Sequence, residues 1–193
     1  MTQREDLYRG TSRAAWGCFF LYFNINLGPV NILPAFGAYL LFLSAIRLLE
    51  GEVRDLSLLR PFGAALAVWN ILAWSLAIFG ADLSGRLPVV QLVLNLMELW
   101  FFFQLFTDLA ELAKRYETDG EVSRRLLRWR TVQILLLMVL ALPWEPLVRR
   151  WEAAELLMAG LSVTALAACL CIMASIFALR RLFREEAAPE QGG

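Results

Sequence analysis

The feature that most constrains this chain is the length of its uncharged apolar runs. Residues 61 to 81 and 156 to 179 contain no Asp, Glu, Lys or Arg. Each run has about the 20 residues that an α-helix needs to cross the hydrocarbon core of a bilayer. Hydrophobic residues make up 59% of the sequence, against roughly 45–50% in a soluble domain. We therefore expect a membrane protein with helical spans.

Six apolar runs follow one another with only short connections between them. The predicted segments are residues 14–28, 32–49, 61–81, 87–107, 129–144 and 156–179. Glycine and proline mark the turns, as at Gly28-Pro29 and Asp119-Gly120. The predicted fold class is all-α, a polytopic transmembrane helix bundle. One transmembrane domain covers residues 1–184, and residues 185–193 are expected to be a disordered tail.

The basic residues predict the orientation, because Lys and Arg concentrate on the cytoplasmic side of a membrane. With six crossings and the N-terminus inside, fifteen of the eighteen Lys and Arg residues fall inside. Merging the first two runs into one crossing weakens the best division to twelve against six. We therefore expect six segments with both chain ends in the cytoplasm. The first ten residues mix both charges, so we do not expect a cleaved secretory signal.

The first two segments are short and are expected to form a hairpin. About 14 helical residues rise only about 21 Å, against roughly 30 Å of hydrocarbon. Either these short helices are supported by their neighbours, or the connecting sequence NINLGPVNILP lies below the outer surface, where protein or a watery cavity must satisfy its backbone. The charges do not separate a full hairpin from a re-entrant one, since both return to the same side.

Glu98 is the residue that a membrane makes most unusual. It lies near the middle of the fourth run, where an acidic residue costs about 2.5–3.5 kcal/mol on insertion scales. Gln91 and Asn95 precede it on the same helical face. Asn70 and Asn24 are predicted at similar depth on the third and first segments. Because no Lys or Arg lies in a span core, we expect a neutral carboxyl that donates to Asn95 or Asn70.

Two interpretations of these polar residues stay open. In the first, which we predict, the chain binds or transports a small solute or ion at Glu98, Asn95, Gln91, Asn70 and Asn24. In the second, Glu98 only ties helices together, and the chain is a non-catalytic accessory or assembly subunit of a membrane complex. The other polar residues of the fourth segment, Gln104, Thr107 and Asp108, are expected to reach water at the inner boundary.

Composition argues against several classes of chemistry. Histidine is absent, which removes Ser-His and Cys-His nucleophile pairs and the usual metal ligands. The three cysteines, Cys18, Cys169 and Cys171, all lie in apolar runs, where thiols behave as small hydrophobic groups. No catalytic motif is present, so we expect neither an enzyme nor a metal or other cofactor. The net charge is zero, which gives no indication of nucleic-acid binding.

Two further features predict contacts with surroundings. Four arginines, Arg124, Arg125, Arg128 and Arg130, form a basic cluster before the fifth segment. We expect them to contact anionic lipid headgroups at the cytoplasmic face, with a cytoplasmic protein partner as the alternative. Small residues form a stripe on the sixth segment: Thr164, Ala168, Cys171, Ser175 and Ala178. This stripe predicts close packing within the chain or, alternatively, a homodimer face.

Residues 20 to 50 resemble a family of small multi-pass membrane proteins of Gram-positive bacteria that has no known activity. The residues that carry the resemblance are Asn24, Asn26, Leu33, Pro34, Phe36, Gly37, Tyr39, Leu40 and Leu41. The family pattern has an acidic residue where this chain has Ala35. The resemblance implies the bacterial cytoplasmic membrane as the location. In size and segment number the chain also looks like the substrate-capture subunits of energy-coupling-factor vitamin transporters, but its first segment lacks their Ala-x-x-x-Ala docking pattern.

Overall fold

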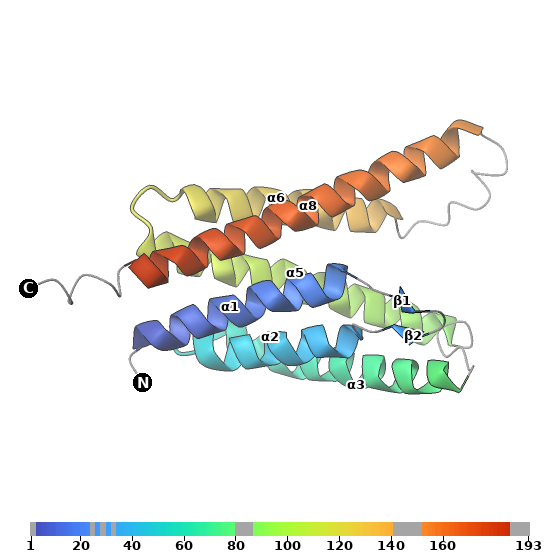
Figure 1. The fold of residues 1–193 in the computed structure, drawn as a ribbon, viewed down its shortest axis with the longest axis horizontal. Helices are drawn as coiled ribbons and strands as arrows, with labels where there is room; N and C mark the ends of the chain where they lie inside the picture. Colours follow the sequence, from blue (N-terminus) through green and yellow to red (C-terminus); the bar gives the residue numbers. More distant parts are fainter. Residues whose placement is uncertain are drawn as a thin grey trace, which may run out of the picture.

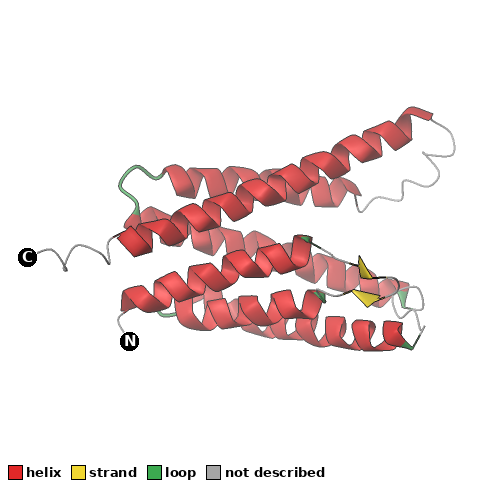
Figure 2. Ribbon diagram, in the orientation of Figure 1, coloured by secondary structure: helices red, strands yellow, loops and turns green. Residues whose placement is uncertain are grey.

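The described residues of the computed structural model, 3–23, 26–27, 30–31, 34–79, 87–140 and 152–185, form a helical bundle (Figure 1). The α-helices are α1 (Gln3–Tyr22), α2 (Ala35–Leu49), α3 (Leu59–Ile78), α5 (Pro88–Tyr116), α6 (Glu121–Leu140) and α8 (Glu152–Glu185). A 3₁₀ helix, η1 (Arg54–Leu58), precedes α3, and two short strands, β1 (Asn26–Leu27) and β2 (Val30–Asn31), lie between α1 and α2 (Figure 2). The predicted all-α class is confirmed for these residues.

The helices run alternately up and down along one long axis, so that α1 begins at the same end of the bundle where α8 finishes (Figure 1). Helix α1 packs against α2 and α8, while α6 packs against α5 and α8. The largest buried side chains include Tyr39 and Phe42 of α2 and Phe101 and Phe106 of α5. Aromatic rings therefore fill the space between α2 and α5.

Three helical stretches are long and apolar enough to cross a membrane: Asp55–Ile78, Val89–Tyr116 and Glu155–Arg184. The bundle buries only 17%, 22% and 22% of their most apolar windows. Large apolar side chains such as Phe79 and Leu156 are 84% and 78% exposed. Contiguous apolar surface of this extent is not tolerated in water, so these helices have the surface of a membrane protein.

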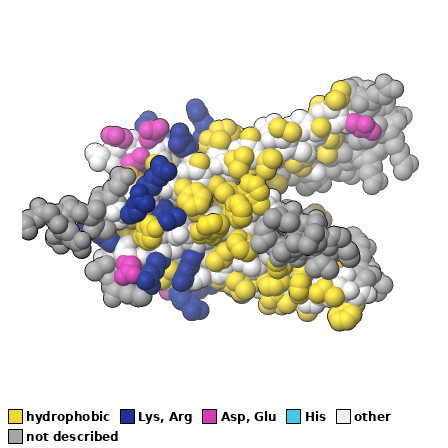
Figure 3. All heavy atoms as spheres, in the orientation of Figure 1, with side chains coloured by type: hydrophobic (Ala, Val, Ile, Leu, Met, Phe, Trp, Pro, Cys, Tyr) yellow, Lys and Arg dark blue, Asp and Glu magenta, His cyan; other side chains and the backbone are white. Residues whose placement is uncertain are grey.

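The Lys and Arg side chains of the described residues gather toward one end of the bundle (Figure 3). Lys and Arg lie near the end where α1 begins and α8 finishes, and apolar side chains cover the middle of the visible face. This end also holds the end of α2, the 3₁₀ helix η1 and the start of α6. The antiparallel course of the helices thus brings together basic residues that are far apart in the sequence.

The helix bounds differ from the predicted segments mainly at the charged end. Helix α1 begins at Gln3 and not near residue 14. Its first turn carries Glu5 and Asp6, which suit the positive end of a helix dipole, and Glu5 pairs with Arg9 at 2.6 Å. Polar residues with these local pairings continue the helix outward from the apolar run. Residues 186–193 of the predicted tail lie outside the described residues.

The predicted hairpin between the first two segments has a small antiparallel ladder at its tip. Asn26 pairs with Asn31, and Leu27 pairs with Val30. Helix α2 begins directly after Pro34, whose extended backbone (ψ 135°) is the conformation expected of a residue that ends a loop. The ladder gives the backbone of this connection hydrogen-bond partners within the chain, as a connection close to lipid requires.

Helices α1 and α2 approach each other closely at two glycines. A Cβ atom added to Gly17 would lie 2.7 Å from the Phe42 ring, and one added to Gly10 would lie 2.6 Å from the Leu49 side chain. These distances leave no room for a methyl group. Glycine spaced by seven residues therefore lets one face of α1 lie against the aromatic side of α2.

The small-residue stripe of the sixth segment is only partly internal. Ala168 and Ser175 are completely buried, whereas Thr164 is exposed. Ser175 donates its hydroxyl proton to the carbonyl of Cys171 at 2.7 Å, which satisfies it within α8. The half of the stripe nearer the charged end thus packs within this chain.

Candidate functional site

Glu98 lies in the middle of α5 and is bonded to a tyrosine from another helix. The Tyr39 hydroxyl of α2 donates to Glu98 Oε1 at 2.7 Å. Tyr39 is 1% exposed, and its ring lies 6.1 Å from that of Phe101 and 6.3 Å from that of Phe42. The carboxyl group, which is itself partly exposed, therefore has a neutral hydrogen-bond partner that is buried among aromatic rings.

The asparagines expected to pair with Glu98 bond within their own helices. Asn70 Nδ2 donates to the carbonyl of Leu66 at 2.8 Å. Gln91 Nε2 donates to Asn95 Oδ1 at 2.8 Å, and the Asn95 side chain is exposed. Short amide side chains find acceptors one turn away on the same helix. The expected bond from Glu98 to Asn95 or Asn70 is thus replaced by the bond with Tyr39.

Two predicted site residues add little to this picture. Asn24 lies outside the described residues. Gln91 turns one end of its amide to Asn95, while its Oε1 atom is buried without a hydrogen-bond partner among the described residues. The structure therefore joins Gln91 to Asn95 by a hydrogen bond, whereas Asn70 is bonded within its own helix.

A second group of polar side chains lies beside the Tyr39–Glu98 pair. Gln133 of α6 donates through Nε2 to the Tyr22 hydroxyl of α1. The Cys169 thiol of α8 interacts with both side chains, and Cys18 of α1 is buried beside it. Tyr22 lies within electrostatic range of Glu98. Two groups of polar side chains, from five helices in all, therefore lie near each other in the bundle.

We call Tyr22, Tyr39, Glu98, Gln133, Cys18 and Cys169 the interior polar cluster. Glu98 is its single carboxyl group. Gln133 is 2% exposed, and its Oε1 atom has no hydrogen-bond partner among the described residues. A buried amide oxygen without a partner loses the energy of its contact with water, about 1–3 kcal/mol. The cluster thus presents oxygen atoms that can accept a proton donor or a small cation.

The described residues contain no group of three or more His, Cys, Asp and Glu side chains placed to hold a metal ion. The donor set of the interior polar cluster is one carboxyl, two phenols, an amide and two thiols, all held by hydrophobic helices. This set suits a proton, a monovalent cation or a hydrogen-bonding solute better than a tightly bound divalent metal.

Sequence reasoning missed Tyr39, the partner of Glu98, and most of the interior polar cluster. Tyr39 appeared only as part of the resemblance over residues 20 to 50. Gln133 is the one amide within the run that follows Arg130, and its position in an apolar segment was a signal that could have been used. The thiol of Cys169 was interpreted as an ordinary hydrophobic group, whereas it contacts the Tyr22 and Gln133 side chains.

Asp108 contradicts the expectation that the inner end of α5 reaches water. The residue is 1% exposed and accepts a hydrogen bond from Gln104 Nε2 at 2.8 Å. Its Oδ2 atom has no hydrogen-bond partner among the described residues. Helix α5 contacts both η1 and α6. The exposure of Asp108 therefore depends on these neighbouring elements and not only on its depth along the helix.

The four arginines predicted to contact lipid headgroups divide into two pairs. Arg124 donates to the carbonyls of Gly120 and Asp119 at the start of α6. Arg130 donates to Thr107 Oγ1 at 2.6 Å and lies 4.1 Å above the Phe103 ring. Arg125 and Arg128 are exposed. Arg124 and Arg130 therefore have hydrogen-bond partners within the chain, whereas Arg125 and Arg128 lie at the surface of the bundle.

The comparisons with known proteins bring no relative to this site. No protein-family model, no curated protein and no solved structure matches the chain.

Proposed function

We propose that the chain is a multi-pass protein of the bacterial cytoplasmic membrane, with six membrane segments and both ends in the cytoplasm. The division of the basic residues between the two sides supports this topology. The concentration of Lys and Arg at one end of the bundle supports it as well (Figure 3). In this arrangement the interior polar cluster lies within the hydrocarbon region.

Within that topology, we propose that the protein binds or transports a small polar solute or cation at the interior polar cluster. The observation that carries the proposal is the Glu98 carboxyl in the middle of α5, bonded to Tyr39 of another helix. The buried Gln133 Oε1, which has no hydrogen-bond partner among the described residues, supplies a second polar atom in the bundle. An ionisable group inside a membrane is costly, and such groups are typical of ion and substrate paths.

The proposed role of each side chain follows from its hydrogen bonds. Glu98 supplies the carboxyl oxygen that binds a proton or cation. Tyr39 supplies a hydroxyl that donates to this oxygen when the site is empty and turns its own oxygen to the ligand when the site is filled. Gln133 Oε1 supplies a further acceptor. Binding therefore changes a bond between α2 and α5, which would link occupancy to helix position.

The test compares the wild type with Glu98→Gln and Tyr39→Phe in proteoliposomes. Proton and monovalent-cation flux are measured, together with thermal shift across a panel of small polar solutes. Glu111→Gln is the matched control, because it makes the same change on the same helix at an exposed position. We expect Glu98→Gln to abolish flux or the ligand shift, and Glu111→Gln to keep both.

A second candidate function is supported by the packing around Tyr39. Its ring contacts Phe42, Phe101 and Phe102, which suits a hydrogen bond that only joins helices. A non-catalytic accessory or assembly subunit would then result. This alternative predicts that the wild type shows neither flux nor a solute-induced thermal shift. Tyr39→Phe should then change only one measured property, the melting temperature, which should fall.

A further inference from the structure

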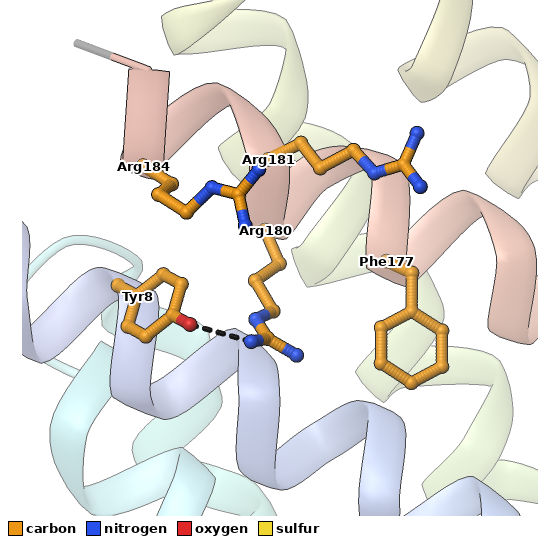
Figure 4. Close-up of a pocket in the computed structure, with 5 residues that line it drawn as sticks. All are labelled: Tyr8, Phe177, Arg180, Arg181 and Arg184. Carbon is orange, nitrogen blue, oxygen red and sulfur yellow. Dashed lines mark hydrogen bonds between the residues drawn. The ribbon is translucent and has the colours of Figure 1, made fainter. Parts of the chain in front are cut away.

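A pocket of about 220 Å³ lies at the charged end of the bundle, between α1 and α8. It is lined by Tyr8, Phe177, Arg180, Arg181 and Arg184, and we call it the arginine pocket (Figure 4). The pocket differs chemically from the interior polar cluster, since three of its five lining residues are cationic. It is smaller than the roughly 300–1,000 Å³ of sites for drug-sized ligands.

Arg180 is held in position across the interface between the two helices. Its guanidinium donates to the Tyr8 hydroxyl of α1, as the dashed line in Figure 4 shows. The guanidinium carbon also lies 4.8 Å from the centre of the Tyr8 ring and 6.0 Å from that of Phe177. A guanidinium has five N–H donors in a rigid plane, so one bond to Tyr8 leaves most of them for a ligand.

The positive charge of the pocket is not balanced by carboxylates of the described residues. Ion pairs of the described residues, such as Arg9 with Glu5, Arg60 with Glu50 and Arg115 with Glu111, do not involve a pocket arginine. Arg180 and Arg184 are one helical turn apart, where like charges disfavour each other. An anion that bridges them would remove this repulsion.

The helix end alone accounts for some of this charge, because cations are favoured near the negative end of a helix dipole and on the cytoplasmic side of a membrane. Neither effect requires a fixed geometry. The bond and the stacking contact with Tyr8 orient Arg180 in one direction, whereas Arg181 extends away from Tyr8 (Figure 4). A group oriented across a helix interface is the feature expected of a binding site.

We infer that the arginine pocket binds a phosphate group, with Arg180 as the central donor and Arg184 completing the charge. Planar guanidinium groups match the geometry of phosphate oxygens and bind them through paired hydrogen bonds. The small volume suits a phosphate group with few attached atoms. Two sources share this chemistry, the phosphodiester of an anionic lipid headgroup and a soluble phosphate.

The test uses the full chain in micelles of dodecyl maltoside, a detergent without phosphate, and measures the melting temperature. In one arm inorganic phosphate is added at constant ionic strength. In the other arm about one fifth of the detergent is replaced by phosphatidylglycerol, or by oleate as an anionic lipid without phosphate. Stabilisation by phosphatidylglycerol but not by oleate indicates the headgroup, and stabilisation by inorganic phosphate indicates the soluble source. Either result supports the inference.

The variants separate a built site from general charge. We expect Arg180→Gln and Arg184→Gln to weaken phosphate binding by about tenfold, as the loss of a charge-assisted hydrogen bond implies. Tyr8→Phe, which releases Arg180 and keeps its charge, weakens binding less. Arg47→Gln is the matched control, because it removes one exposed positive charge from the end of α2, at the same end of the bundle.

Equal losses in Arg47→Gln and Arg184→Gln would overturn the inference in favour of a diffuse basic surface. So would the absence of stabilisation by both phosphate sources in the wild type. If Arg180→Gln does not fold, Arg184→Gln and Tyr8→Phe decide the matter, since Arg184 is exposed and Tyr8→Phe removes only a hydroxyl group.

Discussion

The interior polar cluster and the arginine pocket both bond an ionisable side chain to a tyrosine hydroxyl, with different results. In the interior, the Glu98 carboxyl is bonded to the uncharged hydroxyl of a buried tyrosine from another helix. In the pocket, the Arg180 guanidinium is also bonded to a tyrosine, Tyr8, but keeps further donors for water or an anion. The comparison shows that the same type of partner fixes a helix contact in one place and presents a charge in the other.

The largest expected effect separates the two tyrosines. Tyr39→Ala removes a buried ring and the hydroxyl bonded to Glu98, and we expect a loss of about 3–5 kcal/mol in the free energy of unfolding. Tyr8→Ala, at a partly exposed position, should lose clearly less. Reversible unfolding in mixed micelles measures both values. Equal losses would show that the interior is no more tightly packed than the pocket.

The close approach of α1 and α2 supplies the next effect. Gly17→Ala places a methyl group against the Phe42 ring, and overpacking of this kind costs about 1–3 kcal/mol. Gly160→Ala is the control, because a Cβ atom there meets no atom within 4 Å. We expect that substitution to leave stability unchanged or to raise it by a few tenths of a kcal/mol. Melting temperatures that fall together in both variants would contradict the glycine contact.

The hydrogen bond of Tyr39 can be isolated from its ring. Tyr39→Phe leaves the Glu98 carboxyl without its partner, and we expect a loss of about 1–2 kcal/mol. In the double variant with Glu98→Ala the loss from Tyr39→Phe should disappear, since the acceptor is gone. A double-mutant cycle on unfolding free energies measures this coupling. Additive losses would mean that the two side chains do not act on each other.

The smallest effect is expected from an ion pair at the charged end. Glu50→Gln breaks the ion pair with Arg60. The Glu50 side chain is 31% exposed and the Arg60 side chain is 43% exposed. Solvent screens such pairs, so we expect a loss of no more than about 1 kcal/mol that decreases as salt is added. A loss as large as that of Tyr39→Phe would remove the contrast between the charged end and the interior.

The sequence was sufficient for the class of the fold and for the identity of the unusual residue. Apolar runs predict helices because their length and composition act locally, and Glu98 stands out because a carboxyl in such a run is costly. The partner of Glu98 was not predictable in the same way. Tyr39 is 59 residues away, and its contact depends on which faces of α2 and α5 are turned toward each other. Asn70 and Asn95 matched in depth but found closer acceptors on their own helices.

The ends of the helices, too, were only partly predictable from the sequence. Helix α1 extends over Glu5 and Arg9, whose local pairing continues a helix beyond the apolar run. A hydropathy criterion does not register that pairing. Asp108 was expected at the wet end of its segment, yet it is buried, because exposure depends on the neighbouring elements as well as on depth.

Cysteine labelling tests the central claim most directly, namely that the bundle crosses the membrane with its basic end in the cytoplasm. Single cysteines are placed at Leu87 and Thr118, which lie at opposite ends of α5 and are both exposed, after the native cysteines are replaced by alanine. We expect a membrane-impermeant maleimide to label position 87 in intact cells and position 118 only after permeabilisation. Labelling of both positions from outside, or of position 118 alone, would contradict the topology.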